Sequence, residues 1–234
     1  MGIFDFLDGL DGYEDRAKPA RRMNKRHKLI IDPVAGEIEG ARLLDLGAQD
    51  GRWSYAFAAA GAREVVAVEP REDLTPRYEA FPEAEFKSRV RFRHADLFDA
   101  LEADLASGER YDVIAVLGIL YHILDHGRLI SLLRAHQPKL VIIDSEFMTQ
   151  ANPMIQLSRE KTEKHLNAAP AFDGQTTAVI GTPSRMALEI LAESYDLATT
   201  WIDAKALFGT DRSGVQDYFR QGNKRRATCH LRPI

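Results

Sequence analysis

Short apolar runs alternate with helix-forming segments from residue 41 to residue 144, and this rhythm narrows the possible folds more than any other feature. Five runs predict strands, at 41–46, 64–68, 90–94, 111–117 and 140–144. Four segments between them predict helices, at 52–60, 72–86, 99–107 and 125–135. Four of the runs are mainly apolar, which is typical of strands buried on both faces of a sheet, and the run at 90–94 alternates. Strands joined through helices pair in parallel by right-handed crossovers, so the pattern predicts an α/β fold with helices on both faces.

The rhythm stops after the fifth predicted strand. Residues 145–182 are rich in polar side chains and contain no clear strand–helix unit, and so long a segment inside one domain is usually a lid or a binding segment. Three further elements are predicted after it, a helix at 183–194 and strands at 195–201 and 226–231. We therefore expect a seven-stranded, mainly parallel sheet with an insertion after strand 5. Residues 1–40 are expected to form an N-terminal arm and helix, and residues 41–234 the main domain.

Composition and charge exclude several classes of protein. The net charge of −4 argues against a surface built wholly for nucleic acid, although residues 21–31 are strongly basic. Cys229 is the only cysteine, so neither an internal disulfide nor a cysteine-based zinc site is available. The first residues are acidic, unlike a signal peptide, and no run reaches the roughly 18–20 apolar residues of a membrane span. We expect a cytoplasmic protein without a membrane partner.

Glycine and acidic residues follow the first three predicted strands. In sheets of this kind ligands bind beyond the carboxyl ends of the strands. Gly47 allows a sharp turn after the first strand, and Gly51 allows the backbone to pass close to a ligand at the next helix. Glu69 can accept hydrogen bonds from ribose hydroxyls, and Asp96 from an adenine amino group. Together they predict a nucleoside site, although Asp96 alone is equally explained as a helix cap.

The first loop discriminates between nucleoside ligands. A dinucleotide fold requires G-x-G-x-x-G to hold a pyrophosphate, whereas only Gly47 and Gly51 are present here, with Asp50 between them. A carboxylate would repel pyrophosphate and would attract a sulfonium and an amino group. The loop therefore favours S-adenosylmethionine (SAM) over NAD, and an NAD-dependent oxidoreductase is a remote alternative.

Four segments resemble known motifs in order and spacing. LLDLGAQDGRWS, VVAVEP, RHADLF and YDVIAVLGILYHI are similar to motifs I to IV of class I SAM-dependent methyltransferases, and the resemblance covers residues 41–145. It implies a Rossmann-like seven-stranded fold and SAM as the cofactor. Gln49 departs from the pattern, because the family commonly has a second glycine there. The cofactor is expected to contact Arg22 and the motif residues Asp45, Gly47, Ala48, Asp50, Gly51, Glu69, Pro70, Asp96, Leu97, Leu117 and Gly118.

A narrower resemblance is also present. GILYHI, GTPSRMALEIL and KRRATCHLRP are similar to the enzyme that carboxymethylates hydroxyuridine at the tRNA wobble position. This resemblance implies tRNA as a partner and SAM or carboxy-SAM as the donor. The present chain is shorter and has little room for that family's N-terminal extension, so we expect a small-molecule acceptor and keep tRNA as the alternative. A non-catalytic SAM-binding module is the other alternative.

Tyr121 and His122 follow the fourth strand, where the methyl acceptor should lie. His122 has a suitable pKa to take a proton from a hydroxyl or amine, or it only packs at the pocket edge, whereas Tyr121 is expected to orient the reactants. A divalent cation held by Asp125, Asp144 and Glu146 is an alternative, and we expect no metal. Acceptor-binding candidates are Arg26, Phe147, Met148 and Met154. The apolar N-terminal arm also leaves a homodimer open.

Overall fold

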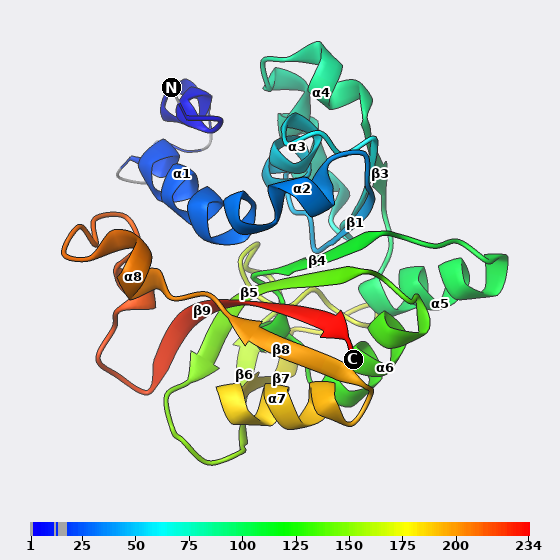
Figure 1. The fold of residues 1–234 in the computed structure, drawn as a ribbon. Helices are drawn as coiled ribbons and strands as arrows, with labels where there is room; N and C mark the ends of the chain where they lie inside the picture. The colour runs from blue at the N-terminus through cyan, green and yellow to red at the C-terminus, as the bar shows by residue number, and fades with distance from the viewer. Residues whose placement is uncertain (1, 12, 14–17) are drawn as a thin grey trace.

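A seven-stranded sheet forms the centre of the protein (Figure 1). The computed structural model describes residues 2–11, 13 and 18–234. The strand order is β3-β2-β1-β4-β5-β9-β8, and β9 is antiparallel to both of its neighbours while the remaining pairs are parallel. The strands span Arg42–Leu46 (β1), Glu64–Val68 (β2), Val90–Arg93 (β3), Val113–Leu117 (β4), Leu140–Met148 (β5), Leu197–Trp201 (β8) and Lys224–Pro233 (β9). The prediction of a seven-stranded, mainly parallel α/β fold is confirmed.

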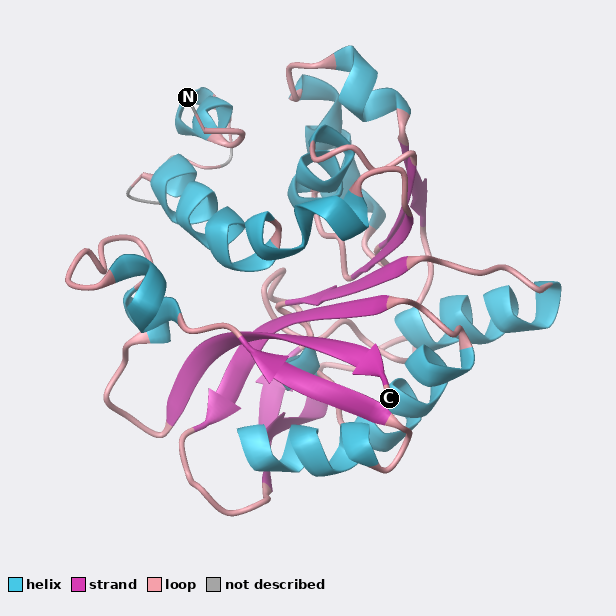
Figure 2. Ribbon diagram, viewed as in Figure 1, coloured by secondary structure: helices cyan, strands magenta, loops and turns pink. Residues whose placement is uncertain are grey.

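Helices cover both faces of this sheet (Figure 2). They span Pro19–Ile30 (α1), Ala35–Ile38 (α2), Arg52–Ala59 (α3), Ala84–Ser88 (α4), Leu97–Ser107 (α5), His126–Ala135 (α6), Arg185–Glu193 (α7) and Ala204–Phe208 (α8). Alternate residues of each strand point to opposite faces, so Leu43 belongs to the core that includes α1 and α3, while Leu44 belongs to the core that includes α5, α6 and α7. The sheet is therefore buried on both sides, as continuously apolar strands require.

Two predicted elements differ from the observed ones. The predicted helix at 72–86 is a 3-10 helix at Glu72–Ala80 followed by the short α4, because Pro76 and Pro82 prevent one continuous α-helix. The fifth strand continues to Met148, since its pairing with β9 extends four residues beyond Asp144.

The insertion contains a β-hairpin that the sequence analysis did not predict. Strands β6 (Ile155–Lys161) and β7 (Thr177–Pro183) pair antiparallel and form a separate two-stranded sheet. The N–H of Gly181 donates to the carbonyl of Ile123, which ties the hairpin to the segment after β4. The insertion therefore folds back over the carboxyl end of the central sheet.

The N-terminal arm packs on its own domain. A 3-10 helix, η1 (Asp5–Gly9), precedes α1, and both Phe4 and Leu7 are completely buried. The ring of Phe4 meets Trp53 edge-on at 5.1 Å between centroids. Among the described residues, no helix has the length and apolar character that a membrane span requires.

Candidate active site

The turn after β1 approaches the segment after β4 closely. Gly47 has a φ of +70° and Gly51 a φ of +79°, both in the left-handed region that favours glycine. A Cβ at Gly47 would collide with the side chain of Ile119, and one at Gly51 with Phe92. Gln49 also has a left-handed φ, of +57°, although it is not glycine. It thus keeps the backbone shape of the family glycine at a cost of about 1 kcal/mol.

Glu69 stands at the end of β2 and faces this turn. One carboxylate oxygen accepts the N–H of Gln49 at 2.9 Å, and the other accepts the N–H of Arg71 at 3.1 Å. Burial raises the pKa of Glu69, against the effect of these two N–H groups. An ionised carboxylate has about four acceptor positions, so two remain for a ligand.

Two adjoining cavities meet at Glu69. One of about 370 Å³ extends towards the ends of β4 and β5, and one of about 660 Å³ extends towards β3 and the hairpin. Both cavities share the wall residues Gly47, Glu69, Arg71, Ile119, His122 and Asn167. The site is therefore a two-lobed cleft with the first-loop glycine and Glu69 at its waist.

Most predicted cofactor residues lie on the wall of this cleft. The smaller lobe contains Arg22, Ala48, Leu117 and Gly118. The larger lobe contains Pro70, Asp96 and Leu97. The carboxylate of Asp96 also accepts the N–H of Phe98 at 2.7 Å and caps α5, so the residue has the cap role as well as its place on the wall.

Asp45, Asp50 and Gly51 do not line either lobe in the part of the chain that the structure describes. Asp50 is fully buried, pairs with Arg52 and accepts a hydrogen bond from the hydroxyl of Tyr13. Its charge is therefore compensated within the protein, and its predicted contact with the cofactor is replaced by a role in shaping the loop. Asp45 lies beneath the loop and accepts the hydroxyl of Ser54 at 2.7 Å.

A buried ion network forms the far wall of the smaller lobe. Asp144, at the end of the parallel part of β5, contacts Arg26 at 2.6 Å and Arg226 at 2.8 Å. Arg226 and Arg22 both pair with Asp217. Three guanidinium groups thus face two carboxylates, which leaves an excess of one positive charge beside the cleft.

His122 lies where the two lobes meet. Its Nδ1 is 2.6 Å from a carboxylate oxygen of Glu160 on β6, and its ring contacts the tilted ring of Tyr121, with 4.1 Å between the ring centres. Burial lowers the pKa of His122, and the carboxylate of Glu160 opposes this shift. When Nδ1–H donates to Glu160, Nε2 is left as a proton acceptor. The sequence analysis missed Glu160, although the alternating run IQLSREK contains a signal for its strand.

A second missed residue, Arg71, holds the insertion over the cleft. Its guanidinium donates to the backbone carbonyls of Thr162, Lys164, His165, Asn167 and Ala168, at 3.0–3.4 Å. Arg71 is two residues beyond Glu69, so the same loop carries the proposed ribose ligand and the anchor of the insertion.

Three of the residues predicted to bind the acceptor lie away from the cleft. Phe147 and Met148 are buried in the extended β5 and border a different hollow, beside α7. Phe147 packs edge-on against Trp201. The carbonyl of Met154 accepts the N–H of Ser184 before α7, and the N–H of Met154 donates to the hydroxyl of Ser184. These residues therefore support the sheet and its neighbours. Arg26 does reach the cleft, through the ion network.

The acidic residues considered for a cation are separated. Asp144 is engaged by arginines, and Asp125 caps α6 through the N–H of Arg128. No group of three or more metal-binding side chains occurs among the residues that the structure describes.

Comparison with known proteins decides the family. The model of a methyltransferase domain family matches residues 19–201. The chain belongs to this family. The expectation of a class I, SAM-dependent methyltransferase is thereby confirmed. A search of curated proteins found no match to the chain.

Solved structures with the same fold are distant in sequence. The N-terminal domain of EvdMO1, crystallised with S-adenosylhomocysteine (SAH) and D-fucose, has a TM-score of 0.59 and 17% identity, covering 91% of this chain and 82% of that one. A Listeria monocytogenes protein described as a putative SAM-dependent methyltransferase has a TM-score of 0.61 and 13% identity, covering 92% and 99%. The Burkholderia thailandensis 1,6-didemethyltoxoflavin N1-methyltransferase has a TM-score of 0.53 and 15% identity, covering 98% and 84%.

Proposed function

We propose that this methyltransferase binds SAM across the two-lobed cleft and methylates an oxygen or nitrogen of a small-molecule metabolite. The observation that carries this proposal is the waist of the cleft, where Glu69 and His122 face both lobes. SAM is likewise divided into two parts, the adenine and the methionine, which are joined through the ribose. This shape matches two lobes that meet at Glu69.

The residues of each lobe fit one half of SAM. Asp96, Leu97 and Pro70 would hold the adenine, and the free acceptor positions of Glu69 would take the ribose hydroxyls. Ala48 and Gly118 border the smaller lobe, where the methionine half would lie. The excess positive charge of the arginine network suits a carboxylate, either that of the methionine half or one on the acceptor.

His122 is positioned to act as the base. When bound, SAM supplies an electrophilic methyl group on a sulfonium. The Nε2 of His122 would accept the proton that an attacking hydroxyl or amine loses, while Glu160 fixes the ring through Nδ1. The lowered pKa keeps His122 neutral, and thus able to accept a proton, at neutral pH. The tilted ring of Tyr121 packs against the imidazole and would limit its rotation.

The roof of the cleft favours a small acceptor over tRNA. The insertion is anchored by Arg71 beside the lobe that contains His122, which leaves a lobe of about 370 Å³ for the methionine half and acceptor. The basic runs that suggested RNA are partly used inside the protein, since Arg22, Arg26 and Arg226 all have carboxylate partners. The narrower wobble-uridine resemblance remains a prediction, and wobble-uridine tRNA the competing substrate.

The donor site is tested by calorimetry with SAM and SAH on the full chain. Glu69→Gln removes the negative charge that accepts ribose hydroxyls, so we expect about a tenfold or larger loss of affinity for both ligands. Glu72→Gln changes an exposed carboxylate in the same loop and serves as the matched control. Equal affinities for wild type and Glu69→Gln would contradict the proposal that Glu69 binds the ribose.

The base is tested by the pH dependence of turnover against a panel of hydroxyl and amine acceptors. We expect His122→Asn to lower kcat by about 100-fold. Glu160→Gln should lower kcat less and move the acidic limb of the profile to lower pH, because Glu160 raises the pKa of His122. Glu163→Gln, an exposed residue beside the hairpin, is the control. An unchanged profile in Glu160→Gln would show that the pair has only a structural role.

A further inference from the structure

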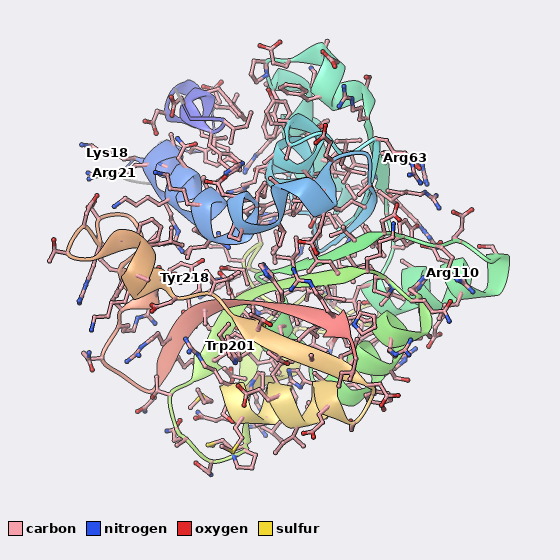
Figure 3. All side chains as sticks on the ribbon, in the orientation of Figure 1. Lys18, Arg21, Arg63, Arg110, Trp201 and Tyr218 are labelled. Atoms are coloured by element: carbon pink, nitrogen blue, oxygen red, sulfur yellow. The ribbon has the colours of Figure 1, made fainter. Side chains whose placement is uncertain are left out.

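A third hollow, of about 400 Å³, lies between the start of α7, the end of β8 and the beginning of β9. It borders Arg226 but does not include the glycine turn or Glu69. Figure 3 labels Trp201 and Tyr218, which line this hollow, and shows Arg110 in a separate part of the molecule. Its wall contains the paired Arg226, the carboxylate of Asp203 and four further cations, Arg185, Lys205, Arg212 and Arg225.

These four cations lack ion-pair partners within the described chain. The nearest carboxylates already have other donors. Asp203 caps α8 by accepting the N–H groups of Lys205 and Ala206, and Glu189 accepts the indole N–H of Trp201 at 2.6 Å. By contrast, neighbouring arginines outside the cluster, such as Arg226, are paired with aspartates. Asp203 on the same wall and the nearby Glu189 keep their negative charges, so the four unpaired cations exceed these two carboxylates by two positive charges.

Aromatic rings hold two of the guanidinium groups in place. Arg185 lies 4.7 Å from the ring centre of Trp201, and Arg212 lies 4.6 Å from that of Phe219. A guanidinium stacked on a ring keeps its N–H edges free, and this planar fork matches two oxygens of a phosphate.

Several repulsions act on Arg185 that a bound anion would weaken. Arg185 is the first residue of α7, and the first turn of this nine-residue helix contains no acidic residue. A cation at the positive end of a helix dipole is repelled. Burial lowers the pKa of Arg185, and the charge of Arg225 lowers it further. A bound anion would therefore weaken each of these repulsions.

We propose that this hollow is a binding site for a phosphorylated small molecule. Its phosphate oxygens accept hydrogen bonds from Arg185 and Arg225, while Lys205 and Arg212 add positive charge at the rim. The volume leaves room for an organic group beside the phosphate. The site is separate from the proposed methyl-donor cleft and does not depend on it.

Calorimetry of the full chain at low ionic strength tests this site, with pyrophosphate and ribose 5-phosphate as probes. Glu69 could take a ribose and the arginines of the donor cleft could take an anion, so each titration is repeated with the donor cleft saturated by SAH. Binding that persists in the presence of SAH reports on the third hollow. We expect both to bind, and the double variant Arg185→Gln/Arg225→Gln to bind at least about tenfold more weakly. Arg110→Gln, an exposed arginine without a carboxylate partner among the described residues, should leave binding unchanged and is the matched control. SAH affinity should be the same in all three proteins.

A melting experiment gives an independent readout. Because the double variant loses repelling charges, its Tm in phosphate-free buffer should equal or exceed that of wild type, and only wild type should be stabilised by pyrophosphate. The proposal is overturned if neither probe binds at millimolar concentration, or if Arg110→Gln weakens binding as much as the double variant. It is also overturned if an RNA oligonucleotide binds through Arg185 and Arg225 while ribose 5-phosphate does not.

Discussion

Asp45 and Asp144 are two equally buried carboxylates in the same sheet with opposite electrostatics. They are 1 % and 0 % exposed, and each lies near the carboxyl end of a parallel strand. Burial raises the pKa of Asp45 to about 7, since among the described residues only Ser54 donates a side-chain hydrogen bond to it, and the charge of Glu69 adds to the shift. Burial would also raise the pKa of Asp144, but its partners lower it to about 2.

The difference between them comes from their partners. Asp144 receives the charges of Arg26 and Arg226 and hydrogen bonds from Tyr218 and Thr228. Asp45 has one neutral donor. Burial alone therefore does not decide whether a carboxylate is ionised. Asp144 is a fixed negative charge that holds α1 and β9 to the end of β5, whereas Asp45 changes its charge near neutral pH.

The largest expected effect comes from Asp144→Asn, which leaves Arg26 and Arg226 buried without their carboxylate. Removing one partner of a buried pair destabilises a protein by about 3–5 kcal/mol. Urea unfolding at pH 7 measures this loss. Asp112→Asn, a half-buried carboxylate at the opposite edge of the sheet, is the control and should cost about 1 kcal/mol. If Asp144→Asn cost no more than the control, the ion pairs of Asp144 with Arg26 and Arg226 would not stabilise the fold.

Asp45→Asn should change how stability depends on pH. The folded protein keeps the Asp45 proton up to about pH 7, and the unfolded chain releases it near pH 4, so Asp45 lowers stability as pH rises through this window. The accumulated loss is about 4 kcal/mol, and Asn removes it.

Unfolding free energies of wild type and Asp45→Asn at several pH values from 4 to 8 test this. The unfolding free energy of the variant, relative to that of wild type, should increase steadily up to pH 7. Asp144 gives no slope in that range, because its contribution is present above the unfolded pKa near 4 and disappears only as pH falls towards 2. Parallel curves for wild type and Asp45→Asn would contradict the raised pKa.

The smallest expected effect is that of Ser54→Ala, which removes the hydroxyl donor to Asp45. We expect a loss of about 1 kcal/mol at pH 8 and a further rise in the pKa of Asp45, since the Ser54 hydrogen bond lowers it. Urea titrations at pH 5 and pH 8 measure both changes. Ser88→Ala, at an exposed helix end, is the control. No effect of Ser54→Ala in the Asp45→Asn background would confirm that the hydroxyl acts through Asp45.

The parts of the site formed by local sequence were predictable. Gly47 and Glu69 follow directly from where two apolar strands end, because parallel strands bring their carboxyl ends to one edge. Asp50 was misinterpreted, since its charge is compensated by Arg52, two residues further on, and its hydroxyl donor Tyr13 lies in the distant N-terminal arm.

The other parts of the site could not be predicted from local sequence, because they depend on pairing between strands that are distant in the chain. Glu160 reaches His122 only because β6 and β7 pair and fold back, and no local pattern specifies where a hairpin lands. Phe147 and Met148 were taken for acceptor ligands because the extension of β5 depends on β9, about 80 residues further along the chain.

The five carbonyl contacts of Arg71 connect residues 162–168, which cover the cleft, to the loop that contains Glu69. The residue that grips residues 162–168 also donates its backbone N–H to Glu69. Any motion that lifts this roof to let molecules pass must either break the bonds to a single guanidinium or pull the Glu69 loop along with it.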